Sequence, residues 1–74
     1  MTETYRIESL GPEDEGGRLV QRIFVRTNTI EAAKERALRV FRRARVPQNR
    51  GPEIDTVRVL NGAGYEIFSI SARD

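Results

Sequence analysis

Arginine is the residue type in this sequence that most clearly offers binding chemistry. Twelve of the thirteen basic residues are arginines, and the chain contains no histidine and no cysteine. Residues 26–50 hold eight basic and two acidic residues, whereas residues 1–25 and 51–74 each carry a net charge of −2. Guanidinium groups bind phosphate oxygens and supply most of the non-specific affinity for DNA or RNA. The candidate nucleic-acid contacts are therefore Arg26, Arg36, Arg39, Arg42, Arg43, Arg45 and Arg50.

The same charges also have an interpretation that needs no ligand. Acidic residues come first and arginines last along this segment, which is the order that a helix dipole favours. Glu35 and Arg39 form a favourable pair four residues apart, whereas Arg39 and Arg43 repel one another at the same spacing. The repulsion indicates that something outside the helix offsets the two charges, and Phe24 between Arg22 and Arg26 is a candidate stacking platform. Both interpretations, a solvated face and a binding face, stay open.

Catalytic chemistry has little support in these residues. Without histidine or cysteine, the usual nucleophile–base pairs and zinc frameworks are absent. The acidic cluster Glu13–Glu15 lacks the spacing of a calcium loop, and we interpret it as part of a solvated loop. The glycines of Asn61–Gly64 lead into a predicted strand rather than a helix, so they do not form a phosphate loop. We predict no enzyme activity, no catalytic residue, no cofactor, no metal and no small-molecule substrate.

One helix, predicted over Thr29–Arg45, carries most of the arginines. Its cap is Asn28 or Thr29, and Val46-Pro47 ends it because a residue before proline avoids helical geometry. At about 100° per residue, its apolar side chains fall in one stripe about 160° wide, as in a helix packed on a sheet. These side chains are Ile30, Ala33, Ala37, Leu38, Val40, Phe41 and Ala44.

Alternating apolar residues predict four strands around this helix. Tyr5–Leu10 and Arg18–Thr27 are predicted to form a first hairpin around the loop Gly11–Gly17. Ile54–Leu60 and Tyr65–Ser71 are predicted to form a second hairpin, since Asn61-Gly62 supplies the positive φ values of a tight turn.

The fold class that follows is α+β, with the order ββαββ. We predict a single small domain over residues 1–74, in which an antiparallel four-stranded sheet is covered on one face by the helix. In the second hairpin, pairing of Leu60 with Gly64 places Arg58 opposite Glu66. The strand order is not decided by the sequence.

The second face of the sheet is predicted to carry apolar side chains that one helix does not cover. An uncovered apolar face usually marks an interface, so we predict a homodimer or a docking surface for another protein. The alternatives are a different register or a sheet twist that lets the helix cover more. The candidate interface residues are Leu10, Phe24, Leu60, Phe68 and Ile70.

The chain resembles the small bacterial ββαββ proteins that are grouped as domains of unknown function. The shared features are a strand ending in threonine, Glu31-Ala32-Ala33 at the helix start, and the closing hairpin V-R-V-L-N-G-A-G-Y-E-I. The resemblance covers most of the chain and implies architecture only, because such families bring no established activity.

The functional prediction is a small non-enzymatic protein-interaction or self-associating module. The alternative is non-specific nucleic-acid binding through the arginine-rich face of the helix at residues 29–45. The first residues, M-T-E-T-Y-R, do not resemble a signal peptide, and no apolar stretch approaches membrane-spanning length. We therefore expect a cytoplasmic protein with no membrane partner.

Overall fold

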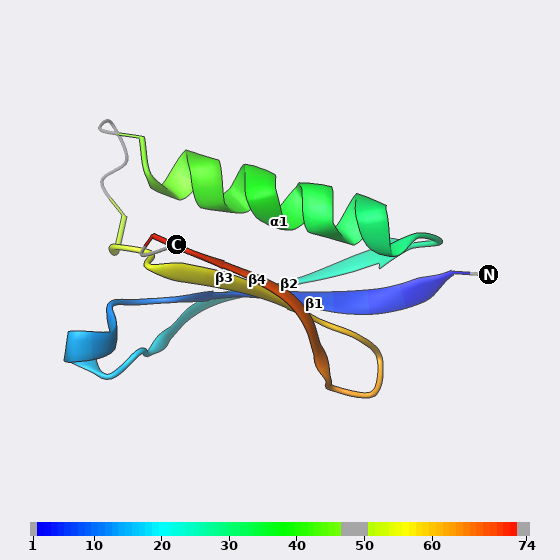
Figure 1. Cartoon of the computed structure of the whole chain (residues 1–74), viewed down its shortest axis with the longest axis horizontal. Helices are drawn as coiled ribbons and strands as arrows, with labels where there is room; N and C mark the ends of the chain where they lie inside the picture. The colour runs from blue at the N-terminus through cyan, green and yellow to red at the C-terminus, as the bar shows by residue number, and fades with distance from the viewer. Residues whose placement is uncertain (1, 47–50, 73–74) are drawn as a thin grey trace.

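The computed structural model describes residues 2–46 and 51–72. Four strands form one antiparallel sheet in the order β2-β1-β3-β4, and one helix lies across one face of it (Figure 1). The elements are β1 (Glu3–Leu10), the short 3-10 helix η1 (Glu13–Glu15), β2 (Leu19–Thr27), α1 (Ile30–Ala44), β3 (Thr56–Leu60) and β4 (Glu66–Ser71). This arrangement confirms the predicted α+β fold and its ββαββ order. No helix among the described residues is both long and apolar enough to cross a membrane.

The strand order places β1 between β2 and β3. Because β1 is antiparallel to both neighbours, β2 and β3 run parallel to one another, and α1 makes the crossover between them. The central strands β1 and β3 therefore have a neighbour on each side, whereas β2 and β4 are edge strands. Both hairpin turns bend away from α1, so the sheet face without a helix lies between them (Figure 1). We call this face, which carries Arg6, Glu8 and Leu10 of β1, the open face.

Local signals define both ends of α1. The Thr29 hydroxyl accepts a hydrogen bond from the Ala32 N–H at 3.1 Å, and Thr29 has extended backbone angles. Thr29 is therefore the N-cap, which settles the choice between Asn28 and Thr29. At the other end, the Arg45 N–H donates to the carbonyl of Arg42. Pro47, which was expected to end the helix, lies outside the described residues.

The helix packs most closely on β3 through two alanines. Ala33 and Ala37 are completely buried, and their small side chains let the α1 backbone approach the sheet. Both belong to a single core cluster together with sheet residues on the helix side. The sheet residues in this cluster are Tyr5, Ile7, Val57 and Val59, and Ile54 joins them from the segment before β3.

The register predicted for the second hairpin was wrong. Arg58 lies opposite Ser69, and Leu60 lies opposite Glu66, with a bulge between Val59 and Leu60. The turn is longer than expected because the Asn61 side-chain oxygen accepts hydrogen bonds from the N–H groups of Ala63 and Tyr65, each at 3.0 Å. Tyr65 is thereby held in the turn, and β4 begins one residue later.

This register changes which side chains of β4 face the helix. Phe68 and Ile70 lie opposite the buried Val59 and Val57, and both pack against the core. They are therefore not available on the second face, contrary to the prediction. The other three candidate interface residues, Leu10, Phe24 and Leu60, do lie on the open face.

A bulge in the first hairpin also changes which side chains face the helix. Ser9 pairs with Gln21, but Leu10 pairs with Leu19, so one extra residue lies on β2. Leu19 therefore lies opposite Leu10 on the open face, while Val20 lines the space between the sheet and α1. Without the bulge, the alternation of side chains along β2 would place these two residues the other way round.

The close contact of α1 with the sheet predicts that Ala37 tolerates no larger side chain. We expect Ala37→Leu to lower the free energy of unfolding by about 1–3 kcal/mol, because added methylenes overpack a filled core. Ala32→Leu is the matched control, since Ala32 is exposed on the same helix. Urea unfolding of both variants is the measurement, and equal stability of the two would contradict this packing.

Candidate functional site

A groove runs between α1 and the edge strand β2. It has a volume of about 600 Å³, and its lining comes from α1, from the paired ends of β1 and β2, and from the segment before β3. The groove exists because a helix about 10 Å wide cannot cover four strands spaced about 4.8 Å apart. Since α1 lies closest to β3, the helix side of β2 stays partly uncovered: Ile23 and Val25 are half-buried, and Gln21 is exposed.

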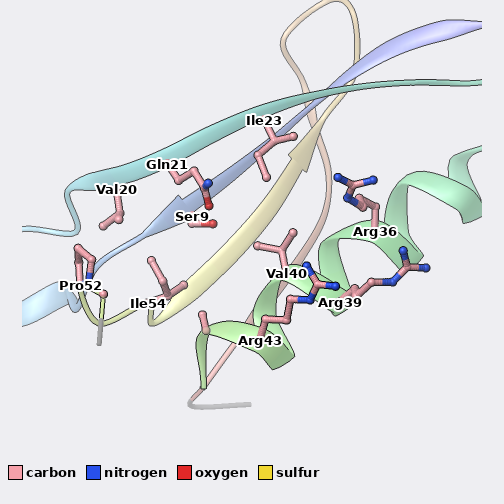
Figure 2. Close-up of a pocket in the computed structure, with 12 residues that line it drawn as sticks. Ser9, Val20, Gln21, Ile23, Arg36, Arg39, Val40, Arg43, Pro52 and Ile54 are labelled. Atoms are coloured by element: carbon pink, nitrogen blue, oxygen red, sulfur yellow. The ribbon is translucent and has the colours of Figure 1, made fainter. Parts of the chain in front are cut away.

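Arg36, Arg39 and Arg43 form the α1 wall of this groove. Their spacing puts them within an arc of about 60° and along about 10 Å of the helix. In Figure 2 the Arg36 side chain extends toward β2, whereas the guanidinium group of Arg39 is turned away from the strands. The ion pairs found among the described residues both involve Glu8, so none of these three arginines forms an ion pair with a described carboxylate. The wall is therefore a concentrated positive charge.

Ser9 and Gln21 supply polar groups on the sheet side of the groove. They are direct cross-strand neighbours, and Figure 2 shows the Ser9 hydroxyl beside the Gln21 carboxamide. Ser9 is only 1% exposed, and its Oγ has no hydrogen-bond partner among the described residues. A buried hydroxyl without a partner is uncommon, because its desolvation is not compensated.

The remaining predicted arginines do not join this wall. Arg26 lies opposite Thr4 on the open face, and Arg42 lies on α1 outside the groove lining. Arg45 is engaged within the protein, since it donates to the carbonyl of Ile54 before β3 at 3.3 Å and lies 5.5 Å from the centre of the Phe41 ring of α1. Arg50 lies outside the described residues. The described arginines among the seven candidates therefore do not form one surface.

The open face carries the most exposed aromatic side chain of the sheet. Phe24 is 64% exposed in β2, opposite Arg6, and Leu19 is 46% exposed at the end of the same strand. Leu60 lies on this face but is only 7% exposed, so it offers little surface to a partner. The apolar surface of the open face therefore belongs mainly to β2.

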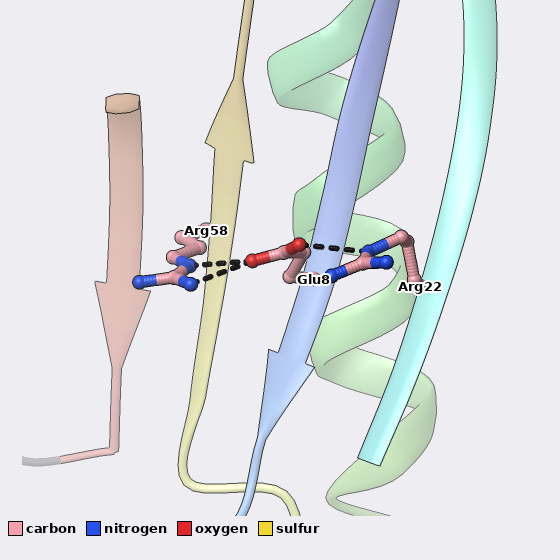
Figure 3. A network of polar contacts seen from close by, with 3 residues as sticks. All are labelled: Glu8, Arg22 and Arg58. Carbon is pink, nitrogen blue, oxygen red and sulfur yellow. Dashed lines mark hydrogen bonds and ion pairs between the residues drawn. The ribbon is translucent and has the colours of Figure 1, made fainter. Parts of the chain in front are cut away.

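Glu8 lies at the centre of the open face and joins three strands. Its carboxylate accepts from Arg22 Nε at 2.9 Å and from Arg58 Nε at 2.8 Å, and Arg58 Nη2 lies 2.7 Å from the same oxygen (Figure 3). The Glu8 side chain is 3% exposed. Burial by itself raises the pKa of Glu8, but the hydrogen bonds and charges of Arg58 and Arg22 outweigh it, so the pKa is lowered. Arg58 therefore pairs with Glu8, and the predicted cross-strand pair with Glu66 is not formed.

The acidic cluster Glu13–Glu15 forms the exposed helix η1 in the first hairpin loop. Across residues 2–46 and 51–72, no group of three or more potential metal-ligating side chains comes together in a metal-binding arrangement.

Comparisons with known proteins found no relative of this chain. No protein-family model, no curated protein and no solved structure matches it. The resemblance to small bacterial ββαββ proteins therefore stays a prediction, and the candidate sites depend on their own geometry.

Sequence reasoning did not single out Ser9 and Gln21. The available signal was that Ser9 shares its strand face with Tyr5 and Ile7, so a small polar residue stands where the alternation calls for an apolar one. Gln21, the second polar residue of the site, is placed beside Ser9 by the pairing of β1 with β2. The arginine wall above them depends on where α1 lies.

The lowered pKa of Glu8 predicts a pH-dependent contribution to stability. The carboxylate stabilises the fold above its ordinary pKa of 4.5, and this contribution is lost as the pH falls through the lower pKa of the folded protein. At neutral pH we expect Glu8→Gln to lower the free energy of unfolding by about 1–2 kcal/mol, since both arginine partners are partly solvent-exposed.

Chemical unfolding at neutral and acidic pH measures this difference. The gap between wild type and Glu8→Gln should shrink in acid, while Glu66→Gln, at an exposed position of the same sheet, should change stability little at either pH. A gap that stays constant down to the lowest pH at which the protein folds would rule out the charged pair as its cause.

Proposed function

We propose that the protein is a non-enzymatic binding module that holds nucleic acid through the arginines of α1. The observation that carries the proposal is the wall of Arg36, Arg39 and Arg43 along the groove, where no described carboxylate forms an ion pair with the three arginines. Arginine is the side chain best suited to phosphate, because its planar fork donates two parallel hydrogen bonds.

The repulsion between neighbouring arginines on α1 supports the proposal. Arg36 and Arg39 are three residues apart, and Arg39 and Arg43 are four apart, so like charges are neighbours on one side of α1, where Glu35 is a favourable neighbour of Arg39 alone. Such pairs destabilise a helix by a few tenths of a kcal/mol each. Bound phosphates would relieve the repulsion, which a purely solvated face does not.

The proposed contact set is smaller than the set predicted from the sequence. It keeps the three arginines that line the groove and leaves out Arg26, Arg42 and Arg45, which lie elsewhere. Three phosphate contacts on a single strand correspond to a slope of about −2 in log affinity against log salt. Binding is therefore expected to be weak and strongly salt-dependent.

We expect Arg36→Gln/Arg43→Gln to weaken binding of a fluorescein-labelled single-stranded oligonucleotide of mixed sequence and to flatten the salt slope by about 1.4. Anisotropy titrations at about 50 and 200 mM salt should show roughly a twentyfold loss for the wild type. Arg42→Gln is the matched control, because it removes one charge from the same helix outside the groove. If Arg42→Gln weakens binding as much per charge removed as the groove variant does, net charge rather than the groove accounts for the affinity.

A second candidate function, self-association, is favoured by Phe24. This ring is 64% exposed on a strand that also exposes Leu19, and an isologous contact between two open faces would bury both side chains in each copy. Glu8 offsets part of the positive charge of Arg22 and Arg58 on the same face. That internal pairing lowers the repulsion between two approaching copies.

For this candidate we expect Phe24→Ser to shift the protein from dimer to monomer in sedimentation velocity over a concentration series. Tyr65→Ser is the control, since Tyr65 is a comparably exposed aromatic residue in the β3–β4 turn. A wild-type protein that stays monomeric throughout the series would exclude self-association through the open face.

A further inference from the structure

We infer that the groove between α1 and β2 accommodates one nucleotide unit, with its phosphate on the arginine wall and its base against Ser9 and Gln21. This inference rests on the proposed nucleic-acid binding and deepens it, because it specifies the part of the ligand that enters the protein. The two ends of the site are chemically different: its outer wall is cationic, and its inner surface is neutral.

The inner end of the site is defined by the Ser9 hydroxyl. Ser9 is 99% buried, its side chain lines the groove, and its Oγ has no hydrogen-bond partner among the described residues. A hydroxyl both donates and accepts, and so does the neighbouring carboxamide of Gln21. Together these two side chains offer the mixed donor and acceptor pattern that the edge of a base presents.

Apolar side chains surround this polar pair. Val20 and Ile23 come from β2, Val40 from α1 and Ile54 from the segment before β3. A heteroaromatic ring fits such a lining, because its faces need apolar contacts and its edge needs hydrogen bonds. The volume of about 600 Å³ is within the range of pockets that hold small organic ligands.

The order of these groups determines which anions the site favours. Arg36 and Arg43 are exposed at the rim, whereas Ser9 is buried at the inner surface, so charge is recognised outside and a neutral ring inside. Inorganic phosphate can contact only the arginines at the rim. A duplex satisfies only the rim as well, because its bases are stacked inside, whereas bases of a single strand can be splayed out. The ligand is therefore a free mononucleotide or one nucleotide of a single strand.

The test is an amide-resolved NMR titration of the full chain with four probes. The probes are the nucleoside 5′-monophosphates, inorganic phosphate, a single-stranded oligonucleotide and the matching duplex. We expect the monophosphates and the single strand to shift the amides of Ser9 and Gln21, whereas inorganic phosphate and the duplex should affect only the arginine wall.

Ser9→Ala separates recognition from folding. Because Ser9 Oγ makes no hydrogen bond within the described chain, its removal should leave the unfolding midpoint unchanged or raised. Affinity for the monophosphates should fall about three- to tenfold, the value of one hydrogen bond. Gln21→Ala, at an exposed position, should give a loss of similar size, and Arg42→Gln should bind the free monophosphates as the wild type does.

The outcomes distinguish this inference from the proposed function. Salt-dependent oligonucleotide binding through Arg36 and Arg43, with no response at Ser9 or Gln21, would overturn the nucleotide site and leave nucleic-acid binding standing. Monophosphate binding that Ser9→Ala weakens, without oligonucleotide binding, would support the site for a free nucleotide and overturn the proposed function. Unchanged monophosphate affinity in both Ser9→Ala and Gln21→Ala would overturn the inference.

Discussion

The contact of Ala33 and Ala37 with the sheet is the constraint on which the rest of this structure depends. Because both side chains are small and fully buried, α1 lies close to β3, and a single helix at that distance cannot also cover β2. The groove follows from this limited coverage, whereas the open face exists because α1 lies on the other side of the sheet. Toward β4 the helix closes the gap differently, with the Lys34 ammonium 5.6 Å from the centre of the Phe68 ring.

Arginines on the two sides of the sheet differ in whether a carboxylate pairs with them. On the open face, Glu8 accepts from Arg22 and Arg58, so charge is balanced within the protein and the network ties β1, β2 and β3 together. Along the groove, Arg36 and Arg43 have no carboxylate partner in the described part of the chain. Arg22 and Arg58 therefore stabilise the fold, whereas Arg36 and Arg43 line the groove in which we propose that a ligand binds.

Hydrophobic periodicity was enough to predict the element order and the apolar stripe of α1, because each strand or helix must bury one side of itself. It failed at the second hairpin. The side chain of Asn61 accepts from two backbone N–H groups in a longer turn. The bulge between Val59 and Leu60 then shifts the pairing by one residue, which turns Phe68 and Ile70 toward the core. A bulge exchanged Leu19 and Val20 in the same manner. Register depends on such single local contacts, and a shift of one residue moves every following side chain to the other face.

The sequence by itself determined the ββαββ order, the apolar stripe of α1 and the concentration of arginine along it, since these follow from local spacing. Only the tertiary structure decided which arginines act together. Arg36, Arg39 and Arg43 become one wall because they flank the side of α1 next to β2, while Arg26 is carried to the opposite face by its strand. The site also needs Ser9 and Gln21, which are distant from those arginines in sequence. Strand pairing and helix placement bring them together, and neither is encoded in the spacing of residues along the chain.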